Sequence, residues 1–164
     1  MMPGLWVSQA MCVATELGIP DELGAGPQSA DAIAERVDAN PDAVDRLLRM
    51  LTGKGLFAQD ADGRFALAPM ADALRSDVSG SVRGIVLFYG HRLHWEHWGQ
   101  FGYCVKTGQP SVDALRGKPI FDYFDENPEF AAVFNTAMTS VSGTQIGLNI
   151  GWLAALQGAN SGAH

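Results

Sequence analysis

Three histidines beside an acidic residue form the first group in this chain whose spacing could do chemistry. His91, His94 and His97 recur at every third position, with Glu96 between them, so they invite comparison with a metal site. On a helix, however, each step of three residues drifts about 60° around the axis, so three such histidines do not converge on one ion. No cluster of carboxylates or cysteines elsewhere supplies the remaining ligands. We therefore expect no metal site and interpret the histidines as residues on the surface or at the rim of a pocket.

A dense set of aromatic side chains occupies the same part of the sequence. Its members are Trp95, Trp98, Phe101, Tyr103, Phe121, Tyr123, Phe124, Phe130 and Phe134. Such a set can pack a hydrophobic core, and the same rings can stack on a flat aromatic ligand. Both interpretations can hold together, because an apolar pocket is a core with a space left in it.

Signatures of common catalytic sites are absent from the sequence. It contains no nucleophile elbow, no P-loop and no Gly-x-Gly-x-x-Gly turn. The paired acids Asp21–Glu22 and Asp125–Glu126 are typical of solvated caps and turns. Cys12 and Cys104 are far apart and lie in apolar helical patterns, which predicts two buried free thiols in a reducing compartment.

The composition indicates a folded, acidic protein. Of its 164 residues, 47% are hydrophobic and 18% are charged, so the chain can build a core. A net charge of −7 disfavours DNA or an acidic membrane surface as a partner. The first residues carry no basic segment typical of a signal peptide. The strongest apolar run, residues 84–90, is far shorter than the ~20 residues that span a bilayer. We therefore expect a cytoplasmic protein without membrane contact.

The first half of the sequence predicts a winged helix. An apolar pattern indicates a first helix over residues 5–17, and Ser29 and Asn40–Pro41 are good starts for two more. The inner face of the third of these helices consists of Val44, Leu47, Leu48 and Leu51. Residues 56–58 and 64–67 flank the turn sequence of residues 60–63, which predicts a β-hairpin wing.

The second half of the sequence predicts more helices around the aromatic set. We expect a short helix over 69–74, a compact apolar one over 82–89, a single longer one over 91–106 and a short aromatic one over 120–124. Residues 111–119 are expected to form a loop. Pro128 begins the last clear helix, whose inward side is predicted to be Phe130, Val133, Phe134, Ala137, Met138 and Val141. The fold class is therefore mainly α, with a small hairpin wing and additional long helices. We divide the chain into a winged-helix module (1–80), a helical extension (81–142) and a tail (143–164).

The order of several segments resembles a known family. They are residues 14–21, 41–51, 55–57, 64–67, 107–110, 117–123, 127–130 and 134–138. Together they resemble the dimerisation domain of plant-type and actinobacterial natural-product O-methyltransferases. No one segment is specific, and the match rests on their order and spacing over about 140 residues.

Apolar excess in the helices over 5–17 and 130–141, which a compact winged helix alone would leave exposed, predicts an intertwined homodimer. The resemblance implies an acceptor pocket lined by helices of this region. The residues expected to line it are Trp95, Trp98, Phe101, Phe121, Phe124, Phe134 and Met138. The complete family uses S-adenosylmethionine, which is bound by a second half that also carries the catalytic histidine. Residues 143–164 are fewer than the roughly 30 that one βαβ unit needs. We therefore expect this chain to hold the dimer contacts and bind the acceptor substrate, without binding the cofactor or catalysing methyl transfer alone.

Two other functions stay open from the sequence. The chain could be a stand-alone binder, or a repurposed enzyme, for aromatic or polyketide-like ligands, rather than the partner of a separate catalytic subunit. It could also be a transcription regulator, although residues 29–67 contain seven acids and five bases, which disfavours DNA binding.

The tail carries two further expectations. Gly143, Gly147 and Gly151 would form one bare face of a helix, suited to close packing across a dimer. Residues 143–157 would then cover the aromatic groove with Ile146, Ile150, Trp152, Leu153 and Leu156.

Overall fold

Helix caps and one apolar stripe organise the helices and hairpin at the N-terminal end, for which we keep the name winged helix from the sequence-based prediction. In the computed structural model, which describes residues 4–142, α3 (Ala30–Arg36) begins after Ser29, whose Oγ accepts a hydrogen bond from the N–H of Ala32. Likewise α4 (Pro41–Thr52) begins after Asn40, whose Oδ1 accepts from the N–H of Ala43 at 3.0 Å. Each cap satisfies a backbone donor that the first turn would leave unpaired. Val44, Leu48 and Leu51 of α4 are buried, and Leu47 packs at the edge of the same core.

The wing is a two-stranded antiparallel hairpin. Strands β1 (Phe57–Gln59) and β2 (Phe65–Leu67) pair with Phe57 opposite Leu67, and both phenylalanines are buried. Asp60 stabilises the turn, because its Oδ1 accepts hydrogen bonds from the backbone N–H groups of Asp62 (3.0 Å) and Arg64 (2.8 Å). The predicted fold class, mainly α with a small hairpin wing, is confirmed.

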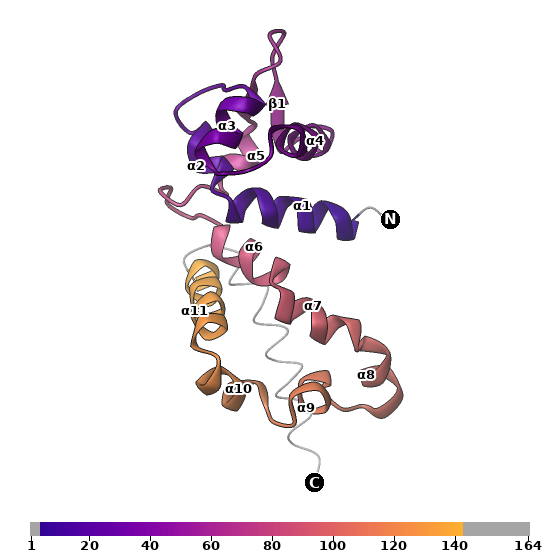
Figure 1. Cartoon of the computed structure of the whole chain (residues 1–164). Coiled ribbons are helices and arrows are strands. Elements are labelled where there is room, and N and C mark those ends of the chain that lie inside the picture. The colour runs from indigo at the N-terminus through magenta and orange to yellow at the C-terminus, as the bar shows by residue number, and fades with distance from the viewer. Residues whose placement is uncertain (1–3, 143–164) are drawn as a thin grey trace.

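Helix α1 (Gly4–Glu16) lies between the winged helix and the rest of the chain, as Figure 1 shows. It is followed by the short α2 (Ile19–Leu23), and α5 (Pro69–Asp72) follows the wing. Cys12, Ala14 and Thr15 of α1 are buried, and α1 packs against both α4 and α6 (Arg83–Gly90). The first hydrophobic core therefore extends from the winged helix through α1 to Val86 and Leu87 of α6.

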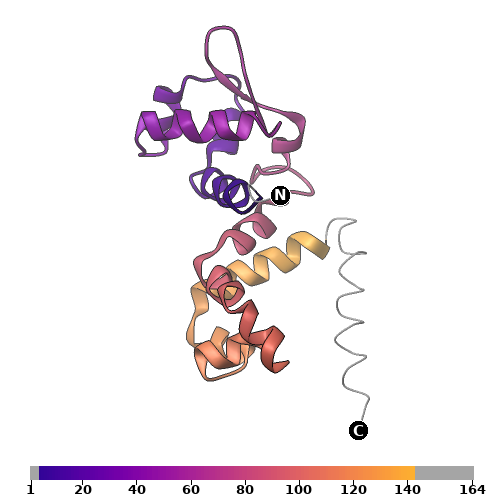
Figure 2. The same ribbon diagram turned by 90° about the vertical axis from the view of Figure 1, so that its right-hand side faces the viewer.

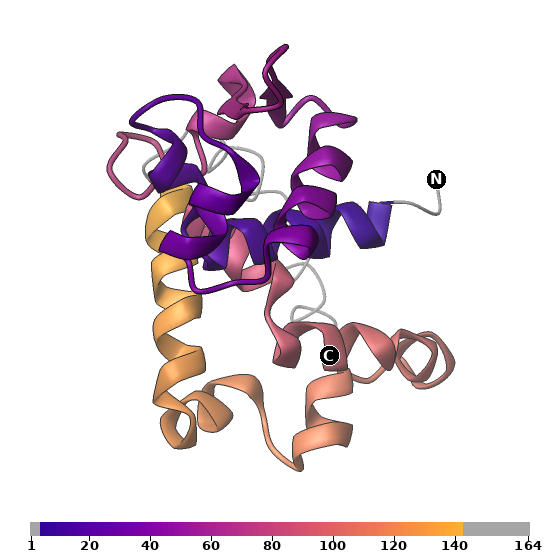
Figure 3. The ribbon, with the colours of Figure 1, turned by 45° about the horizontal axis from the view of Figure 1, so that its top comes forward.

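The second half of the described chain winds away from α6 and returns to it (Figures 1 and 3). Its helices are α7 (Arg92–Gly99), α8 (Phe101–Thr107), α9 (Ser111–Arg116), α10 (Ile120–Glu126) and α11 (Pro128–Ser142). Helix α11 packs along α6, which Figure 2 shows from the side. A second core forms where Leu93, Phe124 and Phe130 meet.

The structure corrects two expectations in this half. The single helix expected over 91–106 is two helices, because the turn around Gln100 tightens: Gln100 N–H bonds to the carbonyl of His97, and Tyr103 N–H to that of Gln100. Gly99 weakens the helix at this point. The loop expected over 111–119 begins with α9, which Gly117 ends in a left-handed conformation (φ 70°).

Several expectations meet a partial test or none. Cys12 is buried as expected, but Cys104 is only half-buried. The domain boundary expected near residue 80 stays a prediction. Helix α6, which follows that position, contributes Val86 and Leu87 to the first core. The expectations for Gly143, Gly147, Gly151 and residues 143–157 fall outside the described residues. Within residues 4–142, no helix has the length and apolar character needed to cross a membrane.

Candidate functional site

The junction between α6 and α7 is built around His91. Its Nδ1 accepts a hydrogen bond from the backbone N–H of Leu93 (3.2 Å), so the imidazole caps α7. Its ring also stacks on Phe130 of α11, with centroids 4.7 Å apart. Burial lowers the pKa of His91, with a further lowering from Arg92, against the opposite effects of Glu16 and Glu96. A neutral His91 thus fixes the direction in which α7 leaves α6.

A hollow of about 290 Å³ lies between α7 and the helices that follow it. We call it the aromatic hollow, and its lining residues are Phe88, His94, His97, Trp98, Val112, Ile120, Phe121, Phe124, Phe130 and Phe134. Its rings are mutually packed: Phe124 lies 4.9 Å from Phe134 and 5.4 Å from Phe130 between centroids. Phe121 and Trp98 are 67% and 55% exposed. The hollow therefore offers aromatic faces to a ligand and also exposes them to solvent.

Two histidines supply polar groups in this apolar lining. His94 Nε2 accepts a hydrogen bond from Trp98 Nε1 at 2.8 Å, and its ring contacts Phe88 edge-on at 4.7 Å. Burial lowers the pKa of His94, with a further lowering from the neighbouring His97 and His91. Burial, followed by the charge of Arg116, lowers the pKa of His97 against the opposite effect of Glu96. Both rings are therefore neutral near pH 7. A neutral imidazole has one donor and one acceptor nitrogen. Because Nε2 of His94 already accepts from Trp98, its Nδ1–H remains to donate to a hydroxyl oxygen of a ligand.

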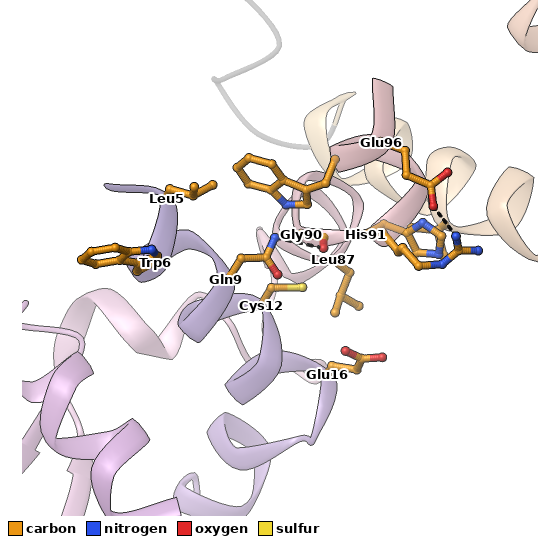
Figure 4. A pocket seen from close by; sticks show the side chains of 12 residues that line it. Leu5, Trp6, Gln9, Cys12, Glu16, Leu87, Gly90, His91 and Glu96 are labelled. Carbon is orange, nitrogen blue, oxygen red and sulfur yellow. Dashed lines mark hydrogen bonds and ion pairs between the residues drawn. The ribbon is translucent and has the colours of Figure 1, made fainter. Parts of the chain in front are cut away.

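A larger pocket of about 830 Å³ lies between α1 and the α6–α7 junction (Figure 4). We call it the α1–α7 pocket; its lining includes Leu5, Trp6, Gln9, Cys12, Glu16, His91, Trp95 and Glu96. Gln9 reaches across it and donates to the carbonyl of Gly90 at 3.4 Å, as Figure 4 shows. Burial, followed by the charge of Glu16, raises the pKa of the Cys12 thiol, which makes the thiol a poor nucleophile.

The residues predicted for the acceptor pocket are distributed over more than one hollow. Trp98, Phe121, Phe124 and Phe134 meet in the aromatic hollow. Trp95, Trp98 and Phe101 line a third hollow of about 600 Å³ beside Leu5. Met138 is half-buried on α11 and lines none of these three hollows.

Sequence reasoning missed the α1 wall of the α1–α7 pocket. Leu5 and Trp6 are exposed apolar residues at the start of α1, and a tryptophan so close to the start of an apolar helix was the available signal in the sequence. Their apposition to α7 depends on the packing of α1 on α6, which the local pattern does not encode.

The described residues do not fit a metal or the family's cofactor. Within residues 4–142, no group of three or more His, Cys, Asp or Glu side chains is placed to hold a metal ion. The two strands of this region form a hairpin, whereas a nucleoside cofactor such as S-adenosylmethionine is held by a parallel sheet with a Gly-rich strand–helix turn. No chemical step through the cofactor is therefore assigned to these residues.

A protein-family comparison matches the first half of the chain. The model of the O-methyltransferase dimerisation domain matches residues 1–77, which include α1, the winged helix and α5.

Curated relatives extend the similarity beyond that domain. The chain is 35% identical to the mitomycin biosynthesis 6-O-methyltransferase of Streptomyces lavendulae, over 90% of this chain and 42% of that enzyme. It is 31% identical to the phenazine O-methyltransferase PhzM of Lysobacter antibioticus, over 84% of this chain and 40% of that enzyme. The chain thus spans about two fifths of these relatives' length and corresponds to their N-terminal portions.

Solved structures share the same arrangement of helices. The crystal structure of LaPhzM superposes with a TM-score of 0.81 at 30% identity, over 87% of this chain and 42% of that one. The structure of CalO1, a methyltransferase in calicheamicin biosynthesis in its S-adenosylhomocysteine-bound form, gives a TM-score of 0.77 at 28% identity, over 86% of this chain and 42% of that one.

Proposed function

Because residues 1–77 belong to the O-methyltransferase dimerisation domain family, we propose that this chain makes the dimer contacts and binds the acceptor substrate of a small-molecule O-methyltransferase. The methyl group would come from S-adenosylmethionine, bound outside the described residues. The residues described here would bind the acceptor and orient it. The observation that carries the acceptor-binding proposal is the aromatic hollow.

The chemistry of the aromatic hollow favours a planar, hydroxylated aromatic acceptor. Flat rings gain stacking and apolar burial against Phe121, Phe124 and Phe134. The neutral imidazoles of His94 and His97 provide hydrogen-bonding groups for a phenolic hydroxyl. Relatives named for mitomycin and phenazine substrates agree with this class of ligand.

The outer surface of α1 supports dimerisation. Leu5, Trp6 and Val13 are 47%, 66% and 42% exposed, although Ala10, Cys12, Ala14 and Thr15 of the same helix are buried. Apolar side chains gathered in this way on one helix are typical of an interface. We propose that a second copy of the chain covers them.

Two alternatives differ in what supports them. A stand-alone binder of aromatic ligands would use the same aromatic hollow, so the observation that supports the main proposal supports this alternative as well. A DNA-binding regulator is disfavoured, because three arginines of the winged helix already pair with carboxylates: Arg36 with Glu22, Arg49 with Asp45, and Arg64 with Asp60 and Asp62.

Titration with 1-hydroxyphenazine tests the acceptor-binding proposal. Stacking on the hollow should quench tryptophan fluorescence in a saturable way, because Trp98 lines it. Trp98→Phe keeps an aromatic ring and serves as the control that assigns the signal. Absence of saturable binding in both calorimetry and fluorescence would contradict the proposal. Sedimentation at micromolar concentration tests dimerisation separately, and a folded monomer would contradict that part.

A further inference from the structure

The outer wall of the aromatic hollow is attached to the molecule by little apolar burial. No residue of α8 is buried, and the only buried residue of α9 is Ser111. Ala114 and Leu115 of α9 are exposed, and Val112 is half-buried. With so few buried apolar contacts, α8 and α9 separate easily from the rest of the fold unless polar contacts hold them.

Arg116, the last residue of α9, makes those polar contacts. Its guanidinium pairs with the carboxylate of Glu96 on α7, and its Nε donates to Nε2 of His97 at 3.5 Å. The same guanidinium lies 5.1 Å from the ring centroid of Tyr123 on α10. One side chain, 19% exposed, thus joins three helices that line or flank the hollow.

Arg116 also faces the hollow's polar lining. His97 lines the hollow, and Val112 lies one helical turn before Arg116 on α9. Helix α9 packs on both α7 and α10. The position of α9 therefore determines the distance between α7 and α10. The pairing with Arg116 lowers the pKa of Glu96, which keeps this carboxylate ionised as its partner.

We infer that Arg116 is a positioning residue that holds α9 and α10 against α7 and thereby sets the width of the aromatic hollow. We call the contacts of Arg116 with Glu96, His97 and Tyr123 the Arg116 clamp. The inference rests on the proposed function and deepens it, because the clamp would select between narrow and wide planar acceptors. Arg116 would not contact the acceptor's reacting hydroxyl. It acts through the helices that it joins.

The test compares Arg116→Met with Arg92→Met in the full chain. Arg92 also pairs with Glu96, but Arg92 and Glu96 lie on the same helix, α7, so their ion pair joins no second helix. Arg92 is 76% exposed. Methionine keeps an apolar stem in each case. Dissociation constants are measured for 2-naphthol, with two fused rings, and 1-hydroxyphenazine, with three. We expect Arg116→Met to change the ratio of the two constants by roughly tenfold, toward the wider ligand, since a small misfit in an apolar pocket has effects of this size. Arg92→Met should leave the ratio unchanged, and Arg116→Lys should restore part of it.

Hydrogen exchange gives a second measurement that needs no ligand. The amides of residues 111–126 should exchange faster in Arg116→Met and not in Arg92→Met. If the wild type binds both probes and Arg116→Met keeps their ratio, the clamp is overturned while the proposed function stands. If the wild type binds neither probe, the proposed function fails, and unchanged exchange in residues 111–126 overturns the clamp as well. If Arg116→Met does not fold, Glu96→Gln, which removes the same ion pair, is measured by the same two criteria.

Discussion

At the scale of single residues, the pKa values of His91, His94 and His97 are all lowered. Each ring accepts a different hydrogen bond: His91 from the N–H of Leu93, His94 from the indole N–H of Trp98, and His97 from Arg116. In each case burial is the largest cause of the lowered pKa. Spacing alone places all three on one helix, whereas His91 is the cap residue that precedes α7. Spacing could not reveal three different hydrogen-bond partners.

The free energy of unfolding should fall as the pH drops below the ordinary histidine pKa of 6.5. The folded protein binds these protons less readily than the unfolded chain, so stability is fully present above 6.5 and is lost as the pH falls toward the lowered values. Denaturant midpoints at pH 7.5 and 5.5 measure the effect. His94→Gln can still accept from Trp98 but does not titrate, so its midpoint should depend less on pH. Equal dependence in the two proteins would contradict the assignment to His94.

Asn40 is a cap whose contribution can be measured separately. Replacing it with alanine removes the acceptor for the N–H of Ala43 and should destabilise the protein by about 1 kcal/mol. Asn40→Ser keeps a capping oxygen and should remain within a few tenths of a kcal/mol of the wild type. Thermal unfolding of the three proteins is the measurement, and equal melting temperatures for Asn40→Ala and wild type would show that the cap contributes nothing.

At the scale of elements, the sequence predicts those helices and strands whose signals are local. The caps at Ser29 and Asn40, the stripe of α4 and the turn at Asp60 specify the winged helix almost completely. Helix α9 is missed because it has no apolar stripe, and it is held by contacts of Arg116 that span up to 20 positions in the sequence. Four of the ten residues that line the aromatic hollow, Trp98, Phe121, Phe124 and Phe134, are among those that the sequence analysis names for an acceptor pocket. The α1–α7 pocket is not, because it depends on how closely α1 approaches α6.

Gly90 permits that close approach. A Cβ atom at this position would overlap Cβ and Sγ of Cys12 on α1. Gly90→Ala should therefore destabilise the protein by about 1–3 kcal/mol, the usual cost of overpacking. Gly102→Ala is the matched control, since nothing lies within 4 Å of a Cβ there, and it should stabilise α8 by about 0.5–1 kcal/mol. Denaturant unfolding compares them; a neutral Gly90→Ala would mean that α1 and α6 separate easily.

At the scale of the whole molecule, α6 joins two cores that carry different roles in the proposed function. The first core contains the winged helix and α1, whose outer side exposes Trp6. The second core lies against the aromatic hollow, at which Phe121 is exposed. The exposed fractions are nearly equal, 66% for Trp6 and 67% for Phe121, so exposure alone does not distinguish the two surfaces. Their positions in the fold do.

Trp6→Ser and Phe121→Ser should therefore each change a different quantity, the first the dimer dissociation constant and the second the affinity for the aromatic ligand. Trp6→Ser removes a large apolar side chain from the proposed dimer contact and should raise the dimer dissociation constant by about tenfold or more, as truncation of an interface tryptophan commonly does. It should leave the affinity for 1-hydroxyphenazine nearly unchanged, because Trp6 does not line the aromatic hollow. Phe121→Ser should weaken that ligand several-fold and leave the dimer intact. Sedimentation and calorimetry on the same preparations separate the two effects. If either variant changes both quantities equally, the dimer contact and the acceptor site are one surface, and the division of roles between the two cores is wrong.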